Sequence, residues 1–285
     1  MTVDLCGIEL AHPVVNGSGT FDVIAARRVF GAAADENFPF AAFVSKTITL
    51  EPRLGNPPPR LFETPAGLIN SIGLPNRGVA GYLEHDLPEL ATLPVPLITN
   101  VMGSNADEVG QLFEALEPRD EIAAIELNVS CPNVKTGLDI GADPAELSKL
   151  LAVVRAKTSK PLIVKLTPNT ANVALVASAA EASGADAVSL INTLRAFALD
   201  PRRPGKAWLG GGTGGQSGPA IRSVALAQTS AVAAAIELPI IAMGGIATAA
   251  HGRQFLDAGA RIVAVGTESF RDPMAGAKVA AGLLS

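Results

Sequence analysis

The most reactive side chains of this 285-residue chain follow one apolar run, Ile122 to Leu127. Asn128, Cys131 and Asn133 come directly after the run, and Pro132 stiffens the segment between the last two. A buried strand that ends in a thiol and two amides is typical of one wall of an active site. Cys131 can act as a general base if its surroundings bring its pKa toward the working pH. The alternative is a plain strand end, with Cys131 as a small buried hydrophobic residue.

Two lysines and five asparagines form a second group of candidates. Lys165 lies inside the apolar run 162–166, and Lys46 ends another apolar run. Such a lysine offsets a negative charge on a cofactor, forms a Schiff base, or belongs to a structural ion pair. Several amides together can bind a flat polar heterocycle, although each alone is more often a turn or cap residue. The asparagines are Asn70, Asn100, Asn128, Asn133 and Asn192.

Glycine follows the last two apolar runs, at Gly244-Gly245 and at Gly266-Thr267. In a TIM barrel the loops after strands seven and eight often bind phosphate through backbone N–H groups. Glycine suits this role because it lets the backbone approach a ligand closely. The alternative interpretation is a pair of tight turns.

Short apolar runs alternate with longer amphipathic or alanine-rich segments, and this alternation predicts the elements that position the candidates. Gly184 and Gly259 come just after predicted helices, where a left-handed cap favours glycine. The predicted helices cover residues 107–116, 144–157, 171–183, 221–236 and 248–258. The predicted strands cover residues 13–16, 42–46, 97–101, 123–128, 162–166, 187–192, 240–243 and 262–265.

Eight predicted strands, with helices in most of the gaps between them, predict an α/β fold, a TIM (β/α)8 barrel, with a doubly wound sheet as the alternative. Polar or glycine residues follow every predicted strand, and only a closed barrel would bring all of them to one mouth. Val3 to Leu5 and Ile8 to Leu10 predict a hairpin before the barrel. The segments 49–76 and 195–219 are too long for simple connections and are expected to cover the mouth. No domain boundary is visible, so we expect one domain over residues 1–285.

Composition excludes several other classes of protein. The formal net charge is −5 and no basic run occurs, which argues against a nucleic-acid partner. No apolar stretch is long enough to span a membrane, and no signal peptide is visible. Two cysteines and three scattered histidines predict neither a disulfide framework nor a metal site, and reduced thiols fit a cytoplasmic protein.

Many separated segments, in the same order, resemble the family 1 dihydroorotate dehydrogenases over almost the whole chain. The matching motifs are Asn16-Gly-Ser-Gly19, Lys46-Thr47, Gly55-Asn-Pro-Pro-Pro-Arg60, Glu63-Thr-Pro-Ala-Gly67, Asn70-Ser-Ile-Gly-Leu74, Asn128-Val-Ser-Cys-Pro-Asn133, Lys165-Leu-Thr-Pro168, Ile191-Asn-Thr193, Ser217-Gly-Pro219, Gly244-Gly245 and Gly266-Thr267.

The resemblance implies a barrel that carries FMN and oxidises dihydroorotate to orotate in pyrimidine synthesis. Cys131 would take the C5 proton, and Lys165 would offset the charge of the reduced flavin. The implied FMN contacts are Ser18, Gly19, Lys46, Thr47, Asn100, Asn128, Lys165, Ile191, Gly218, Gly244, Gly245, Gly266 and Thr267. The implied orotate contacts are Lys46, Asn70, Ser71, Ile72, Gly73, Leu74, Asn128, Asn133, Asn192 and Thr193.

The segments Cys131-Pro-Asn-Val-Lys135 and Glu51 to Pro57 resemble most the NAD-linked subfamily 1B. That resemblance implies a homodimer core in a heterotetramer, whose second subunit carries FAD and a 2Fe–2S cluster. The two cysteines of this chain could not hold the cluster, which commonly takes four thiolates. The alternatives are a homodimeric fumarate-linked enzyme and a dihydropyrimidine dehydrogenase-like enzyme. From another class comes a Schiff-base aldolase that uses Lys165.

Overall fold

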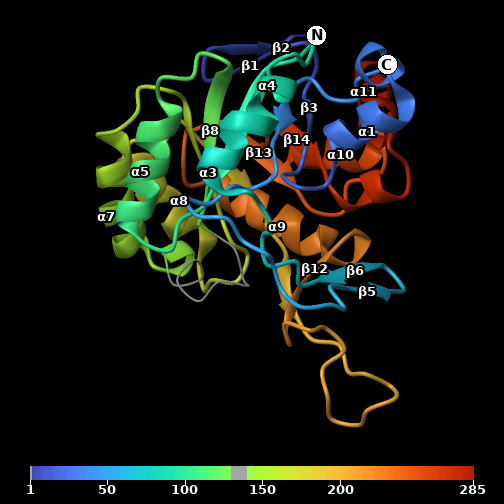
Figure 1. Ribbon diagram of the computed structural model, residues 1–285. Helices are drawn as coiled ribbons and strands as arrows, with labels where there is room; N and C mark the ends of the chain where they lie inside the picture. Colours follow the sequence, from blue (N-terminus) through green and yellow to red (C-terminus); the bar gives the residue numbers. More distant parts are fainter. Residues whose placement is uncertain (1, 130–139) are drawn as a thin grey trace.

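A parallel sheet of eight strands forms the centre of the computed structural model, which describes residues 2–129 and 140–285. The strand order is β3-β14-β13-β10-β9-β8-β7-β4. The strands from β4 to β14 follow one another in sequence order, the first strand β3 pairs with the last strand β14, and helices surround the sheet (Figure 1). This order confirms the predicted TIM barrel over the doubly wound alternative. The strands are β3 (Val14–Asn16), β4 (Phe43–Val44), β7 (Leu97–Val101), β8 (Ile122–Asn128), β9 (Leu162–Lys165), β10 (Ala187–Leu190), β13 (Ile240–Met243) and β14 (Ile262–Val265).

All five predicted helices are present, with ends that differ from the prediction by at most three residues. Gly184 and Gly259 have φ angles of 86° and 103°, as expected for left-handed caps. Asp143 and Asn172 cap helices α7 and α8 by accepting hydrogen bonds from backbone N–H groups. The helices are α1 (Val23–Phe30), α2 (Ala33–Glu36), α3 (Gly78–Gly81), η1 (Tyr82–Asp86), α4 (Leu87–Leu90), α5 (Ala106–Leu116), α7 (Pro144–Arg155), α8 (Val173–Ala182), η2 (Pro219–Ile221), α9 (Arg222–Ala233), α10 (Ala249–Asp257), η3 (Thr267–Phe270) and α11 (Ala275–Leu284).

Side chains that alternate along the strands divide the apolar core into two parts. Ile125 and its counterparts on the other strands face outward and pack with the helices. Ala124, Ile163 and their counterparts face inward and fill the barrel. The predicted hairpin is confirmed as β1 (Val3–Leu5) and β2 (Ile8–Leu10), and its leucines join the inner cluster. The hairpin therefore closes the end of the barrel opposite to the mouth.

A side chain, Asn16, completes the barrel between β3 and β4. Its Nδ2 donates to the Val44 carbonyl oxygen and its Oδ1 accepts from the Val44 N–H, both at 2.8 Å. The Ala41 N–H also donates to the Val14 carbonyl oxygen at 2.9 Å. Asn16 is fully buried, so its amide takes the place of a peptide group in the ladder.

Replacing Asn16 with alanine should lower the free energy of unfolding by about 2–4 kcal/mol, because it leaves a buried N–H and a buried carbonyl without partners. Urea unfolding followed by circular dichroism measures the loss. Asn37→Ala is the matched control, since Asn37 is exposed and makes one hydrogen bond with the Ala33 carbonyl oxygen at 3.2 Å. Equal losses in the two variants would contradict the role of Asn16 in closing the barrel.

The two long connections contain a second sheet, which the sequence analysis did not predict. Its strands are antiparallel, in the order β11-β12-β6-β5, and lie at the mouth of the barrel (Figure 1). The glycine-rich sequence of β12 did not predict a strand, because glycine disfavours strands. A Cβ atom at Gly215 would lie 1.9 Å from the Thr193 hydroxyl oxygen, so glycine is required there. The strands are β5 (Leu61–Thr64), β6 (Gly67–Asn70), β11 (Leu194–Ala196) and β12 (Gly214–Ser217).

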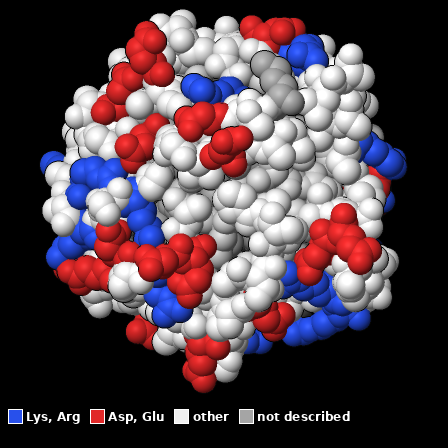
Figure 2. Space-filling model, turned by 90° about the horizontal axis from the view of Figure 1, so that it is seen from above, with Lys and Arg blue, Asp and Glu red and all other residues white. Residues whose placement is uncertain are grey.

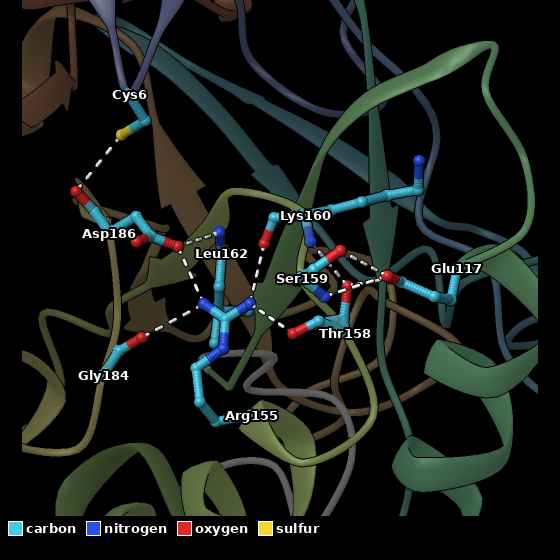
Figure 3. A network of polar contacts seen from close by, with 9 residues as sticks. All are labelled: Cys6, Glu117, Arg155, Thr158, Ser159, Lys160, Leu162, Gly184 and Asp186. Carbon is cyan, nitrogen blue, oxygen red and sulfur yellow. Dashed lines mark hydrogen bonds and ion pairs between the residues drawn. The ribbon is translucent and has the colours of Figure 1, made fainter.

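Polar contacts fix the loops at the closed end of the barrel (Figure 3). Arg155 Nη1 donates to Asp186 at 2.8 Å, and its Nη2 donates to the carbonyl oxygens of Thr158 and Lys160 at 2.6 and 2.9 Å. Asp186 also accepts from the Leu162 N–H at 2.7 Å. One guanidinium therefore ties the last turn of α7 to the starts of β9 and β10.

Glu117, in the same network, should make stability depend on pH. Burial acts to raise the pKa of Glu117, but hydrogen bonds from Thr158 and Ser159 outweigh it and lower the pKa to about 2. Because the folded pKa lies below the ordinary value of 4.5, the stabilisation is complete above that value and is lost as pH falls toward about 2. Glu117→Gln should therefore lower the melting temperature at neutral pH, and the difference from wild type should shrink in acid. Glu114→Gln is the control, because it removes only an exposed ion pair with Lys157. A pH-independent difference for Glu117→Gln would contradict the prediction.

Figure 2 shows the closed end of the barrel, where acidic and basic side chains are interspersed around an uncharged centre.

No helix within residues 2–129 and 140–285 has both the length and the apolar character needed to cross a membrane.

Candidate active site

A cavity of about 350 Å³ lies at the mouth of the barrel, and most of the predicted site residues line it. Asn100 and Ser71 do not line it, and both are fully buried. Cys131 and Asn133 lie outside the described residues. The predicted residues that line the cavity are Ser18, Gly19, Lys46, Thr47, Asn70, Ile72, Gly73, Leu74, Asn128, Lys165, Ile191, Asn192, Thr193, Gly218, Gly244, Gly245, Gly266 and Thr267.

Lys165 ends β9 at the floor of the cavity. The strand register places it between Asn128 on β8 and Ser189 on β10. Its side chain is only 5% exposed, and no described residue accepts a hydrogen bond from its ammonium group or forms an ion pair with it. A buried cation that faces a cavity without a protein partner favours a bound group that is, or becomes, negatively charged.

Lys46 lies across the loop that follows β3. A Cβ atom at Gly19 would be 2.9 Å from the Lys46 ammonium nitrogen, so the absence of a side chain at Gly19 makes room for the lysine. Ser18 Oγ donates to the Ser45 carbonyl oxygen at 2.7 Å and holds the same loop against the end of β4. The two loops together bring a second cation to the cavity.

Glycine loops after β13 and β14 form the other side of the cavity. Gly218, Gly244 and Gly245 have φ angles of 92°, 138° and 72°, which other residues rarely adopt. A Cβ atom at Gly245 would lie 2.8 Å from the Gly218 carbonyl oxygen, so the loop after β13 packs too closely against the loop after β12 for a side chain at Gly245. Thr267 Oγ1 donates to Ser217 Oγ at 2.8 Å and connects β12 to the loop after β14. This backbone-lined hollow suits a phosphate group.

Asn56 holds the segment from Asn70 to Leu74 in place, and the sequence analysis did not single it out. Its Nδ2 donates to Ser71 Oγ at 3.0 Å. A Cβ atom at Gly73 would lie 2.5 Å from the Asn56 backbone nitrogen. Leu74 has a φ of 55°, an unusual backbone conformation for leucine. The Gly55-to-Arg60 motif thus fixes the strained segment. The glycine and the three prolines of this motif are the sequence feature that could have identified Asn56.

Glu126 is the second residue that the sequence analysis passed over. It lies on β8 and is 2% exposed, and its carboxylate accepts hydrogen bonds from Asn100 Nδ2 and Ser189 Oγ. Glu126 could have been identified from the sequence as a charged residue inside an otherwise apolar run. Within the described part of the chain, no group of three or more His, Cys, Asp or Glu residues is suited to hold a metal ion.

Comparisons with known proteins agree with this geometry. The whole chain, residues 1–285, matches the family model described as dihydroorotate dehydrogenase. The chain is 43% identical over 286 residues to the "dihydroorotate dehydrogenase B (NAD(+)), catalytic subunit" of Geotalea uraniireducens, covering 99% of this chain and 92% of the relative. The proteins of the same name from Pelobacter propionicus and Desulforudis audaxviator are 44% and 45% identical, covering 99% of this chain and 92% and 90% of the relatives. The chain therefore belongs to the dihydroorotate dehydrogenase family, the oxidoreductases that convert dihydroorotate to orotate, as its motifs predicted.

Proposed function

We propose that this chain is the FMN-bearing catalytic subunit of an NAD-linked dihydroorotate dehydrogenase, with residues 1–285 as one domain. The observation that carries the proposal is Lys165, a buried cation that faces the cavity without a described partner. The family match and the names of the relatives support the same assignment.

The residues of the cavity fit FMN in both charge and shape. Gly244, Gly245, Gly266 and Thr267 would hold the phosphate through backbone N–H groups of the loops that line the cavity, and a Cβ atom would clash at Gly244 and Gly245. Lys165 would lie against the ring, where its charge offsets the negative charge that arises on reduction. Asn100, which is buried and does not line the cavity, is also a proposed FMN contact, and its Oδ1 has no partner among the described residues. The remaining proposed contacts are Ser18, Gly19, Lys46, Thr47, Asn128, Ile191 and Gly218.

The substrate would lie between the ring site and the small sheet. Dihydroorotate carries a carboxylate and a flat array of carbonyl and N–H groups, which match a lysine and several amides. FMN, when bound, supplies the acceptor for the hydride that leaves C6. Cys131 would remove the C5 proton as a general base. The proposed substrate contacts are Lys46, Asn70, Ser71, Ile72, Gly73, Leu74, Asn128, Asn133, Asn192 and Thr193.

A partner subunit with FAD and a 2Fe–2S cluster would carry the electrons on to NAD, and two copies of this chain would form the core of a cytoplasmic heterotetramer. The relatives' printed description as a catalytic subunit supports the existence of a partner. Phe197 and Leu199, exposed by 53% and 58% on the segment that projects between β11 and β12, offer an apolar surface for contact between chains (Figure 1).

Anaerobic addition of dihydroorotate to the purified chain tests the proposal. We expect the visible absorbance of bound FMN to bleach rapidly, and NAD to reoxidise the flavin only when the partner subunit is present. Reoxidation by fumarate without a partner would instead identify the homodimeric fumarate-linked type. A chain whose flavin stays oxidised, with and without the partner, would contradict the assignment to dihydroorotate.

A further inference from the structure

Glu126 is a buried carboxylate that the proposed reaction does not use. It lies on the inner face of the barrel, two residues before Asn128, on the strand that leads to the cavity. Ser189 Oγ donates to its Oε1 at 2.6 Å, and Asn100 Nδ2 donates to its Oε2. Both carboxylate oxygens therefore accept hydrogen bonds from side chains on neighbouring parts of the barrel. Within the described ranges, Glu126 forms no ion pair with a lysine, arginine or histidine.

The strand register places this carboxylate beneath Lys165. Strands β8, β9 and β10 are adjacent, and Asn128, Lys165 and Ser189 are Cα partners across them. Glu126 pairs with Ile163, one inward-facing position below Lys165 on β9. Its hydrogen bond with Ser189 must therefore cross β9 on the inner face, below the Lys165 side chain. A carboxylate therefore lies beneath the lysine that lines the floor of the cavity.

Glu126 also fixes the direction of the Asn100 amide. Asn100 on β7 is the Cα partner of Glu126, and it gives its Nδ2 group to the carboxylate. Its Oδ1 is left buried without a partner among the described residues. Rotating the amide by half a turn would bring Oδ1 against the carboxylate oxygen, which is repulsive. The carboxylate thus keeps an unused acceptor, and not a donor, on the free side of Asn100.

We infer that Glu126, acting from below Lys165 and without contact with the flavin, lowers the reduction potential of the flavin. The inference rests on the proposed FMN site. Reduction adds negative charge to the ring, and a fixed negative charge below Lys165 opposes that gain. An enzyme that passes electrons on to NAD needs a flavin with a low reduction potential, because NAD is a weak oxidant. Glu126 therefore limits the stabilisation that Lys165 alone would give to reduced FMN.

The test is the midpoint potential of FMN bound to the purified chain, measured by dye equilibration during chemical reduction. Glu126→Gln should raise the potential, because it removes the negative charge. The shift should correspond to at least a roughly tenfold increase in the affinity for reduced relative to oxidised FMN. Glu121→Gln is the matched control, since it removes an exposed carboxylate next to the same strand and should leave the potential unchanged.

Ser189→Ala gives a second measurement with the opposite sign. It removes the hydroxyl dipole that partly neutralises the carboxylate but keeps the charge, so the potential should fall. Because this variant removes only one buried hydroxyl group, it still tests the effect of the Glu126 charge on the FMN potential if Glu126→Gln does not fold. A purely structural role for Glu126 would not predict opposite shifts in the two variants.

The outcomes separate this inference from the proposed function. Bleaching of wild-type FMN by dihydroorotate, with unchanged potentials in both variants, would overturn the role of Glu126 and leave the proposed function intact. Shifted potentials in a chain that dihydroorotate does not reduce would support Glu126 and contradict the substrate. A wild-type chain that binds no FMN after reconstitution would overturn both.

Discussion

Replacing Lys165 with methionine is expected to slow the reduction of bound FMN by dihydroorotate by roughly 100- to 1,000-fold, the usual effect of removing one group that stabilises developing charge. Methionine keeps most of the apolar length of the side chain but removes the charge. Without the ammonium group, Lys46 is the remaining lysine of the cavity lining, and the carboxylate of Glu126 opposes the negative charge of the reduced ring. Anaerobic stopped-flow absorbance measures the rate.

Lys149→Met is the control for this prediction. Lys149 lies on α7 and pairs with Glu146 at 2.6 Å, and both side chains are largely exposed. The control should reduce FMN at the wild-type rate and unfold at the same temperature within error. A Lys165→Met variant that retains FMN and the wild-type rate would remove Lys165 from the chemistry. Such a result would also weaken the Schiff-base alternative, which requires the same amine.

Replacing Cys131 with alanine is expected to slow the same half-reaction by roughly 100- to 10,000-fold, the range for losing a general base. Cys131 lies outside the described residues, so this expectation rests on the motif and the family. Affinity for FMN should change little, because the thiol is proposed to act on the substrate. The measurement is the rate of flavin bleaching at saturating dihydroorotate, together with the dissociation constant of FMN.

Cys6 provides the matched control, since it is the other cysteine of the chain. Burial, together with the nearby Asp186 and Asp4, raises the pKa of Cys6 to about 11, so its thiol stays protonated and unreactive near neutral pH. Cys6→Ser should keep the wild-type rate. A Cys131→Ala variant with an unchanged rate would mean that another group takes the proton.

The barrel was predictable because its strands are apolar and bounded by glycine or polar residues, and because Gly184 and Gly259 mark the ends of two of its helices. Lys165 was predictable for a similar reason, as a charge in the middle of an apolar run is conspicuous. The small sheet was not, since its strand at Gly214 to Ser217 is determined by the close approach of Thr193 and not by strand propensity.

Glu126 and Asn16 show a second limit of the sequence. Each acts through partners on distant strands, namely Ser189 for Glu126 and Val44 for Asn16. Residue type and spacing do not reveal such pairs, because register across a barrel depends on how all the strands close. Asn16 was predicted as the polar end of a strand, and only the structure shows that it joins two strands.

The pairing of β14 with β3 has a consequence for synthesis of the chain. Val263 is the register partner of Val14, so the ring is closed by contacts between residues almost the whole length of the chain apart. The contacts with the longest sequence separation form slowly because they carry the largest loop-closure entropy. During synthesis on the ribosome, β3 cannot form its pairing with β14 until β14 has emerged. The strand ends that carry the active-site residues can therefore be brought together in a closed ring only after β14 has emerged.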